Sequence, residues 1–189
     1  FLLLPEEISH LFFLCIHRFD LENSLTKLGI TYEIIDSSVI FFNKNLKCIF
    51  TDNHDAKTNT TAALELALNH INRPNDILIT LPAIKKEIFF NGESCSGHTD
   101  YLRKYLNNKY LTMGFFSPRN KILLMTEHLS LKKASLSFST ELFVNKISNT
   151  INGLQQITSR PDNIIFSGIN PHAGEEGMLG DEENIINES

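Results

Sequence analysis

Residues 163–180 read Asn-Ile-Ile-Phe-Ser-Gly-Ile-Asn-Pro-His-Ala-Gly-Glu-Glu-Gly-Met-Leu-Gly. The apolar run at 163–166 has the composition of a short buried strand, and a loop rich in glycine follows it. Pro171 biases Asn170 toward an extended backbone, and the glycines permit a tight turn or the close approach of a ligand. α/β enzymes place metal and substrate groups in such a loop at a strand exit. This predicts a functional His172; a surface turn with a solvated imidazole is the alternative.

Two further histidines occupy similar positions. His98 precedes a helical pattern at 101–106, with Thr99 or Asp100 as its expected N-cap, so we expect His98 just outside a helix N-terminus. Backbone N–H groups and the helix dipole favour an anion there. His128 follows the apolar run 121–125 and thus also ends a predicted strand. Three histidines at the exits of successive β elements predict convergence on one site.

The rest of the chain alternates strand and helix patterns. The run 11–16 predicts a strand buried on both faces, and 20–28 predicts a helix that Asp20 caps and Gly29 ends. Further strands are expected at 32–35, 39–42, 48–50 and 77–79, and further helices at 58–71 and 138–151. Repeated βα units predict an α/β sheet that binds ligands at the carboxyl ends of its strands.

Composition narrows the class of protein. The 189 residues are 42% hydrophobic and 21% charged, with a formal net charge of −5. Such a chain is an ordinary globular one, and no Lys/Arg cluster favours nucleic acid as a partner. Three cysteines without paired spacing fit a reducing cytoplasm. The apolar start at 1–4 is too short for a signal peptide or a membrane span, so we expect a cytoplasmic protein without a membrane partner.

Four segments taken together resemble a known family. Residues 79–85, 97–100, 126–131 and 168–175 are similar, in order and in spacing, to the motifs of 4-hydroxythreonine-4-phosphate dehydrogenase, a family that makes a precursor of pyridoxal phosphate. His98 and His128 stand thirty residues apart, and His128 and His172 forty-four. The Asn-Pro-His-Ala-Gly-Glu segment is highly specific for the family. The shorter histidine motifs are weak individually and become informative because they occur in the same order as in the family.

The resemblance implies a fold and an extent. It implies an α/β fold like that of isocitrate and isopropylmalate dehydrogenases, with a mixed sheet and helices on both faces. Residues 1–189 would be part of a two-subdomain enzyme, incomplete at both ends, because the chain starts without Met and stops inside an expected helix. It also implies a homodimer with the active site at the subunit interface.

The resemblance further implies a reaction and its residues. The reaction is NAD- or NADP-dependent, metal-assisted oxidation of 4-phosphooxy-L-threonine, followed by decarboxylation to 3-amino-2-oxopropyl phosphate. A divalent metal is expected, zinc first, with cobalt, manganese or magnesium as alternatives. No Rossmann or Walker glycine pattern is present. The resemblance implies that a nucleotide would bind as in the isocitrate and isopropylmalate dehydrogenases, whose architecture the family shares. The implied substrate-binding residues are His98, Thr99 and Lys85, the metal ligands His128 and His172, and the cofactor-binding residues Asn170 and Gly174.

Departures from the family pattern leave two alternatives open. Leu81 and Ile84 replace a glycine and a polar residue of the family, so that Lys85 alone remains of that ligand-facing corner. A third metal-binding histidine would lie beyond Ser189, and we expect the chain by itself to be inactive. The alternatives are an inactive relative or fragment, and a sister dehydrogenase of erythronate or threonate 4-phosphate. Glu127 is expected to be a surface carboxylate, with orientation of His128 as its other role.

Overall fold

The computed structural model describes residues 8, 10–42, 44–51, 58–155 and 161–188. The chain divides into two compact units, Phe1–Tyr101 and Leu102–Ser189.

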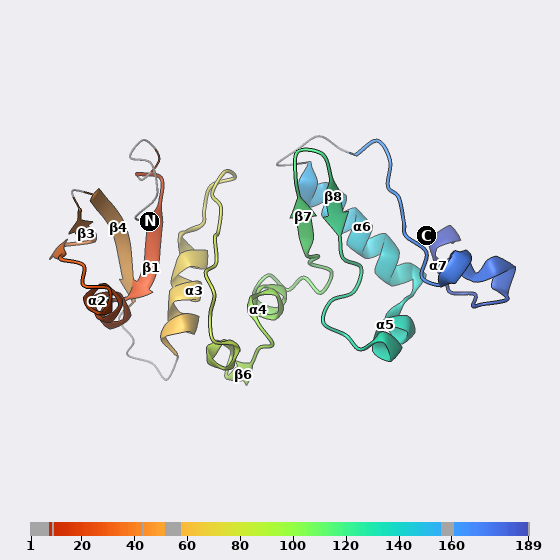
Figure 1. Ribbon diagram of the computed structural model, residues 1–189, viewed down its shortest axis with the longest axis horizontal. Helices are drawn as coiled ribbons and strands as arrows, with labels where there is room; N and C mark the ends of the chain where they lie inside the picture. The colour runs from red at the N-terminus through yellow and green to blue at the C-terminus, as the bar shows by residue number, and fades with distance from the viewer. Residues whose placement is uncertain (1–7, 9, 43, 52–57, 156–160, 189) are drawn as a thin grey trace. The chain divides into compact units, whose positions relative to one another are not determined.

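A four-stranded mixed sheet forms the first part of unit 1 (Figure 1). Its strand order is β1-β4-β3-β2, where the strands span Phe13–His17, Lys44–Thr51, Ser38–Phe41 and Glu33–Ile35 respectively. β1 runs parallel to β4, with Leu14 opposite Cys48, while the two other pairings are antiparallel. The predicted α/β class with a mixed sheet is confirmed, and each of these strands overlaps a predicted one.

Helix α2, Arg18–Lys27, packs against this sheet. Its buried Leu21 and Leu25 join a core completed by residues of β3, β4 and the turn after the helix: Ile30, Val39, Phe41, Leu46 and Cys48. Gly29 ends the helix as predicted, with a φ of +65° that an L side chain rarely adopts. The expected cap is wrong, because the N-cap is His17 and Asp20 lies in the first turn.

Strand β1 is not buried on both faces as predicted. It lies at the edge of the sheet, Phe13 is exposed, and its other residues are only half-buried. A continuous apolar run signals hydrophobicity but not the position of a strand in its sheet, which depends on distant partners.

Helix α3, Asn59–His70, lies against β1 and β4 and joins a second core. Thr58 caps it, accepting a hydrogen bond from the Thr61 amide at 3.2 Å, close to the predicted start. Buried Leu64 packs with Ile88, Cys95 and Tyr101. The elements of this second core after α3 are η1 (Lys85–Glu87), the hairpin β5–β6 (Phe89–Phe90 and Glu93–Ser94) and α4 (His98–Tyr105).

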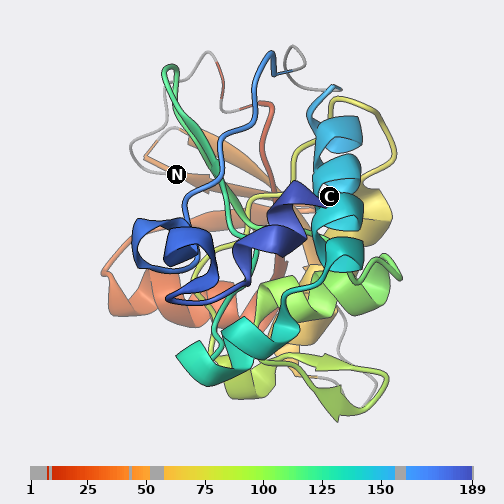
Figure 2. The ribbon, with the colours of Figure 1, turned by 90° about the vertical axis from the view of Figure 1, so that its right-hand side faces the viewer.

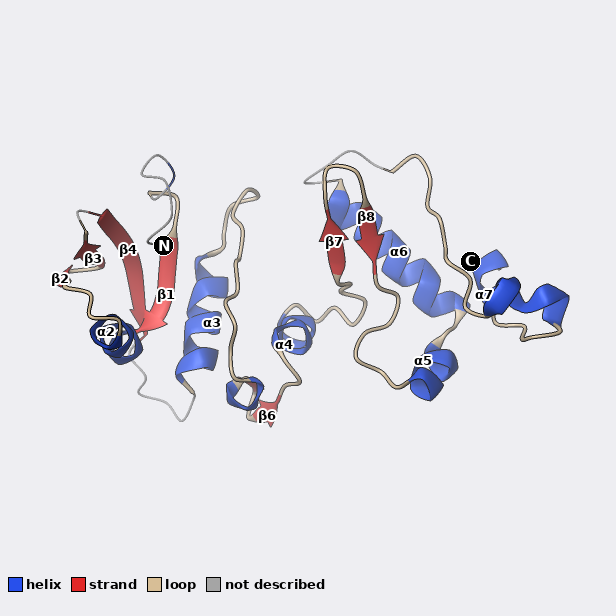
Figure 3. Ribbon diagram, viewed as in Figure 1, coloured by secondary structure: helices blue, strands red, loops and turns tan. Residues whose placement is uncertain are grey.

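Two predicted strands are wrong. Residues 77–79 and 163–166 form no strand and are drawn as loop in Figure 3. Ile77 is 83% exposed and Ile165 is 92% exposed. A strand needs a neighbour to hydrogen-bond with, and neither segment is paired within the described residues. The loop that contains His172 therefore follows a mostly exposed loop segment instead of a buried strand.

Unit 2 consists of a hairpin, helices and a compact turn. The elements are β7 (Gly114–Phe116), β8 (Lys121–Leu123), α5 (Leu131–Ser137), α6 (Thr140–Leu154), η2 (Pro171–Gly177) and α7 (Glu183–Asn187). β7 and β8 pair in antiparallel register, and Figure 2 shows η2 as a tight coil ahead of α7. Buried Phe143 of α6 contacts the rings of Phe138 and Phe166, each centroid 5.7 Å away. None of the described helices is long and apolar enough to cross a membrane.

Candidate metal and substrate site

His98 and Thr99 occupy the first turn of α4. The expectation that His98 lies just outside the helix is wrong, because the helix begins at His98. Asp100 lies inside the first turn, and its Oδ2 accepts a hydrogen bond from the Ser96 amide at 2.8 Å. Both His98 and Thr99 are half-buried. A short polar loop thus leads directly into a helix whose first residues expose part of an imidazole and a hydroxyl.

Burial lowers the pKa of His98 below its ordinary value of 6.5, because desolvation disfavours the charged imidazolium. A histidine whose pKa is lower in the folded state holds fewer protons there than in the unfolded chain. The free energy of unfolding should therefore rise with pH from the folded-state pKa up to about 6.5, above which the ring is neutral in both states and its contribution no longer changes. We expect an NMR titration of the His98 ring protons to give a midpoint below 6.5. A midpoint at or above 6.5 would contradict this environment.

Lys85, the third predicted substrate residue, is the first residue of η1 and is exposed. The turn that carries it is held by α3, since the Thr61 hydroxyl donates to the Glu87 carbonyl at 2.9 Å and the Thr60 hydroxyl donates to the Glu87 carboxylate at 3.0 Å. Ile88, just after η1, shares the second core with Tyr101 of α4. Lys85 and His98 are thus positioned by one hydrophobic cluster, and the ammonium group of Lys85 is open to solvent.

His128 is exposed and adopts a φ of +53° in unit 2. A non-glycine residue in this left-handed region is uncommon, and such residues persist where the surrounding structure holds them. Two residues later, the Ser130 hydroxyl caps α5 by accepting from the Lys133 amide at 3.4 Å. His128 therefore lies in a short constrained segment with its ring open to a ligand.

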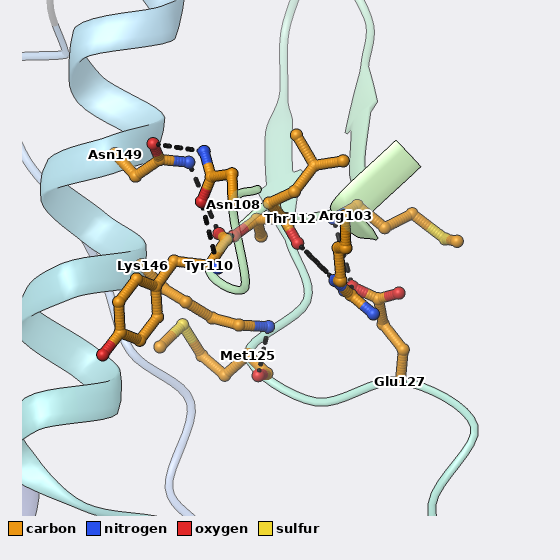
Figure 4. A network of polar contacts seen from close by, with 10 residues as sticks. Arg103, Asn108, Tyr110, Thr112, Met125, Glu127, Lys146 and Asn149 are labelled. Atoms are coloured by element: carbon orange, nitrogen blue, oxygen red, sulfur yellow. Dashed lines mark hydrogen bonds and ion pairs between the residues drawn. The ribbon is translucent and has the colours of Figure 1, made fainter. Parts of the chain in front are cut away.

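Glu127 is not the surface carboxylate that we expected. Its side chain is only 5% exposed and forms an ion pair with Arg103 at 2.8 Å (Figure 4). Glu127 also accepts a hydrogen bond from the Met113 amide at 3.2 Å, while Arg103 donates to the Leu111 carbonyl through Nε and Nη2 at 3.0 and 2.9 Å. Since a buried charge is costly without a partner, the ion pair accounts for the burial of this carboxylate.

Lys146 is a buried charged residue that the sequence reasoning missed. It is 6% exposed, and its Nζ donates to the Met125 carbonyl at 2.8 Å (Figure 4). Burial lowers the pKa of Lys146, with nearby Arg103 lowering it further and Glu127 opposing both. The available signal was helical spacing, because Lys146 follows the core residue Phe143 by three positions and so shares its face of α6.

The loop around His172 turns through a left-handed coil. Residues 172–176 all have positive φ, and His172, at φ +48°, is exposed. Gly174 is buried at φ +82°, where an added Cβ would collide with the Gly180 carbonyl oxygen and lie 3.0 Å from Glu183 Oε2. The predicted need for glycine in a tight turn is confirmed at this position.

Acidic residues of the segment that follows close the loop. Glu183 Oε1 accepts from the amides of Ile169 and Asn170 at 2.9 and 2.6 Å. The Asn170 side-chain amide donates to Glu182 at 2.6 Å and to Glu183 at 3.0 Å. Hydrogen bonds from Asn170, first from its backbone and then from its side chain, lower the pKa of Glu183. Asn170 thus fixes the loop, and its side-chain amide is already engaged.

The donor set for a metal is partial. Among the described residues no group of three or more His, Cys, Asp or Glu side chains is placed to hold an ion. His128 and His172 are both exposed in unit 2, so their ring nitrogens are accessible. Imidazole is a common ligand of zinc and related ions. Their chemistry therefore suits metal ligation, and further donors would be needed to complete a site.

Comparison with known proteins agrees with the motifs. A family model described as pyridoxal phosphate biosynthetic protein PdxA matches residues 23–189. The 4-hydroxythreonine-4-phosphate dehydrogenase of Sulfurihydrogenibium sp. (strain YO3AOP1) is 35% identical over 114 residues, covering 59% of this chain and 35% of that protein. The D-threonate 4-phosphate dehydrogenase of Salmonella typhimurium is 28% identical over 109 residues, covering 58% of this chain and 33% of that protein. The chain thus spans about a third of the length of these curated relatives.

A solved structure supports the fold. The crystal structure of a 4-hydroxythreonine-4-phosphate dehydrogenase from Burkholderia phymatum matches 74% of this chain and 46% of that chain, with a TM-score of 0.55 at 23% identity. The predicted resemblance is confirmed by the family match, which extends over most of the chain. This chain belongs to the PdxA family of pyridoxal phosphate biosynthetic proteins.

Proposed function

We propose that the chain is part of a dehydrogenase that oxidises 4-phosphooxy-L-threonine, with NAD or NADP as hydride acceptor, and releases CO2 to give 3-amino-2-oxopropyl phosphate. The observation that carries this proposal is the ordered set of histidine motifs, at His98, His128 and His172, in a chain of the PdxA family. The relatives named 4-hydroxythreonine-4-phosphate dehydrogenase support it.

The substrate-binding role falls to His98, Thr99 and Lys85. The low pKa of His98 keeps its ring neutral near pH 7, so one ring nitrogen can donate a hydrogen bond and the other can accept one. Thr99 adds a hydroxyl at the same helix start, and the exposed ammonium of Lys85 suits a phosphate or a carboxylate. These three groups would bind and orient the substrate.

His128 and His172 would hold a divalent metal through neutral imidazoles, with zinc preferred over cobalt, manganese or magnesium. When bound, the metal would supply positive charge that stabilises charge developing on substrate oxygens, and the nucleotide would accept hydride. Asn170 and Gly174 shape the loop beside His172, and we propose that this loop contacts the nucleotide. The remaining ligands would come from elsewhere in a homodimer with its site at the subunit interface.

The fold would be that of isocitrate and isopropylmalate dehydrogenases, with helices on both faces of the sheet. Residues 1–189 would form part of a two-subdomain cytoplasmic enzyme. The relatives are about three times as long as the region that matches this chain, so the proposed activity is that of a longer protein.

A second candidate is a sister dehydrogenase of D-threonate 4-phosphate. Relatives carrying that name match nearly the same share of this chain. Leu81 and Ile84, which depart from the family pattern beside Lys85, are both exposed and so available to alter substrate choice. A panel of 4-phosphooxy-L-threonine, D-threonate 4-phosphate and erythronate 4-phosphate, assayed with NAD and zinc on the longest natural reading frame, distinguishes the two. No turnover of any of the three would overturn both candidates.

The ligand role of the histidines is tested by substitution. His128→Ala and His172→Ala should each abolish or greatly weaken zinc binding, because each removes one imidazole donor from the site. Both residues are exposed, so circular dichroism should show the fold retained. Calorimetric zinc titration is the measurement, and exposed His70, replaced in the same way, is the matched control. Unchanged zinc stoichiometry and affinity in both variants would overturn the assignment.

A further inference from the structure

We propose that the Arg103–Glu127 ion pair, together with Lys146, is a positioning device that holds His128 ready to bind its metal. The inference rests on the proposed function, because it takes His128 as a ligand. It adds Arg103 and Lys146, which no motif contains, and it assigns to Glu127 the orienting role that was the alternative to a surface carboxylate.

The first observation is that the segment before His128 is anchored twice. Lys146 Nζ donates to the Met125 carbonyl at 2.8 Å, and Arg103 Nη2 donates to Glu127 Oε1 at 2.8 Å. The Met113 amide adds a third contact, to the same carboxylate oxygen of Glu127, at 3.2 Å. Figure 4 shows Arg103 of α4 and Lys146 of α6 reaching the segment that contains Met125 and Glu127. The segment is therefore held at the Met125 carbonyl and at the side chain of Glu127, the residue directly before His128.

The second observation is the backbone of His128 itself. Its φ of +53° is unfavourable for a residue with a Cβ, so neighbouring contacts must hold it. Glu127 holds one side, and the N-cap Ser130 of α5 holds the other. An exposed imidazole on a free segment would lose backbone and side-chain freedom on binding an ion. A segment that is already fixed has less freedom to lose, which raises metal affinity.

The third observation is the contrast between two ion pairs of the same unit. Lys109 and Glu141 pair at 3.5 Å with side chains 76% and 70% exposed, as expected of a solvated surface contact. Glu127 is buried instead, with the two cations Arg103 and Lys146 around it. Apolar side chains would fill such a place at lower desolvation cost. Unlike apolar side chains, the buried charged groups form directional hydrogen bonds with the segment that ends at His128.

The test compares metal affinity among folded variants of the longest natural reading frame, because the donor set in the described residues is partial. Glu127→Ala removes the contacts to Arg103 and Met113, and we expect zinc or cobalt affinity to fall about 10- to 100-fold, the usual effect of losing a group that orients a ligand. Glu127→Gln keeps an acceptor oxygen for both donors and should restore most of the affinity. Glu141→Ala breaks the exposed pair and should leave affinity unchanged. The cobalt visible spectrum, which reports ligand geometry, should change in Glu127→Ala only.

Circular dichroism at low temperature identifies which variants are folded. If Glu127→Ala does not fold, Arg103→Lys takes its place. Lysine keeps the charge but lacks the planar guanidinium and the Nε donor that contacts the Leu111 carbonyl at 3.0 Å, so binding weaker by about threefold or more is expected. Wild-type affinity and spectrum in folded Glu127→Ala or Arg103→Lys, with loss of binding in His128→Ala, would overturn the positioning role alone. Unchanged affinity in His128→Ala would overturn the ligand assignment and this inference with it.

Discussion

Tyr101→Ala is expected to lower the free energy of unfolding by about 3–5 kcal/mol, the range found when large buried aromatic side chains are truncated. Tyr101 is fully buried in the second core of unit 1, where it packs with Leu64, Ile88 and Cys95. Its ring meets that of Phe90 edge to face, with centroids 5.6 Å apart and planes at 84°. Removing the ring leaves a cavity that neighbouring side chains on three separate segments cannot close without moving.

Urea denaturation followed by circular dichroism measures this effect. Tyr101→Phe is the matched control, because it keeps the ring and the packing against Phe90, and a much smaller loss is expected. Since Tyr101 lies three residues after His98 on α4, loosening this core should also raise the pKa of His98 toward 6.5 as its ring becomes hydrated. A loss below about 1 kcal/mol in Tyr101→Ala would show that the second core is loosely packed.

Phe143→Ala is expected to have an effect of similar size in unit 2, about 3–5 kcal/mol. Phe143 is buried on α6 and contacts Phe138, just before that helix, and Phe166, just before the loop that carries His172. It is thus the link between the helix and the base of the loop. We expect the substitution both to destabilise unit 2 and to expose the segment around Phe166.

Limited proteolysis and denaturant unfolding report the two consequences of Phe143→Ala separately. Cleavage within 161–170 should become faster than in the wild type, because the base of the loop loses its ring contact. The neighbouring Val144 is exposed on the same helix, and Val144→Ala should change stability by no more than about 0.5 kcal/mol. Equal effects of the two substitutions would mean that α6 does not pack through Phe143.

The family and the coarse fold could be predicted from the sequence because their signals are local or ordered along the chain. The start of α3 directly after its N-cap Thr58 and the end of α2 before Gly29 follow from capping chemistry, which involves residues within one helical turn. The need for glycine at Gly174 is only partly local, because an added Cβ would also collide with the carbonyl oxygen of Gly180. The spacing of His98, His128 and His172, which indicated the family, is a property of the sequence alone.

Strand pairing and burial depended on residues far away in the chain. The apolar runs at 77–79 and 163–166 resemble strands, but a strand forms only where another chain segment supplies hydrogen bonds. β1 was placed at a sheet edge by its single partner β4, which no local pattern could reveal.

The charged network around His128 illustrates the same limit at the site. Glu127 and Lys146 read as solvent-facing residues by type, because isolated charges avoid the interior. Each became buried only because the fold brings it a partner from 21 or more positions away, Arg103 for Glu127 and the Met125 carbonyl for Lys146. The sequence alone therefore determined which imidazoles are candidates for chemistry and in what order they come. The tertiary structure decided which side chains hold His128 in place, because desolvation and ion pairing depend on distance in space rather than on separation along the chain.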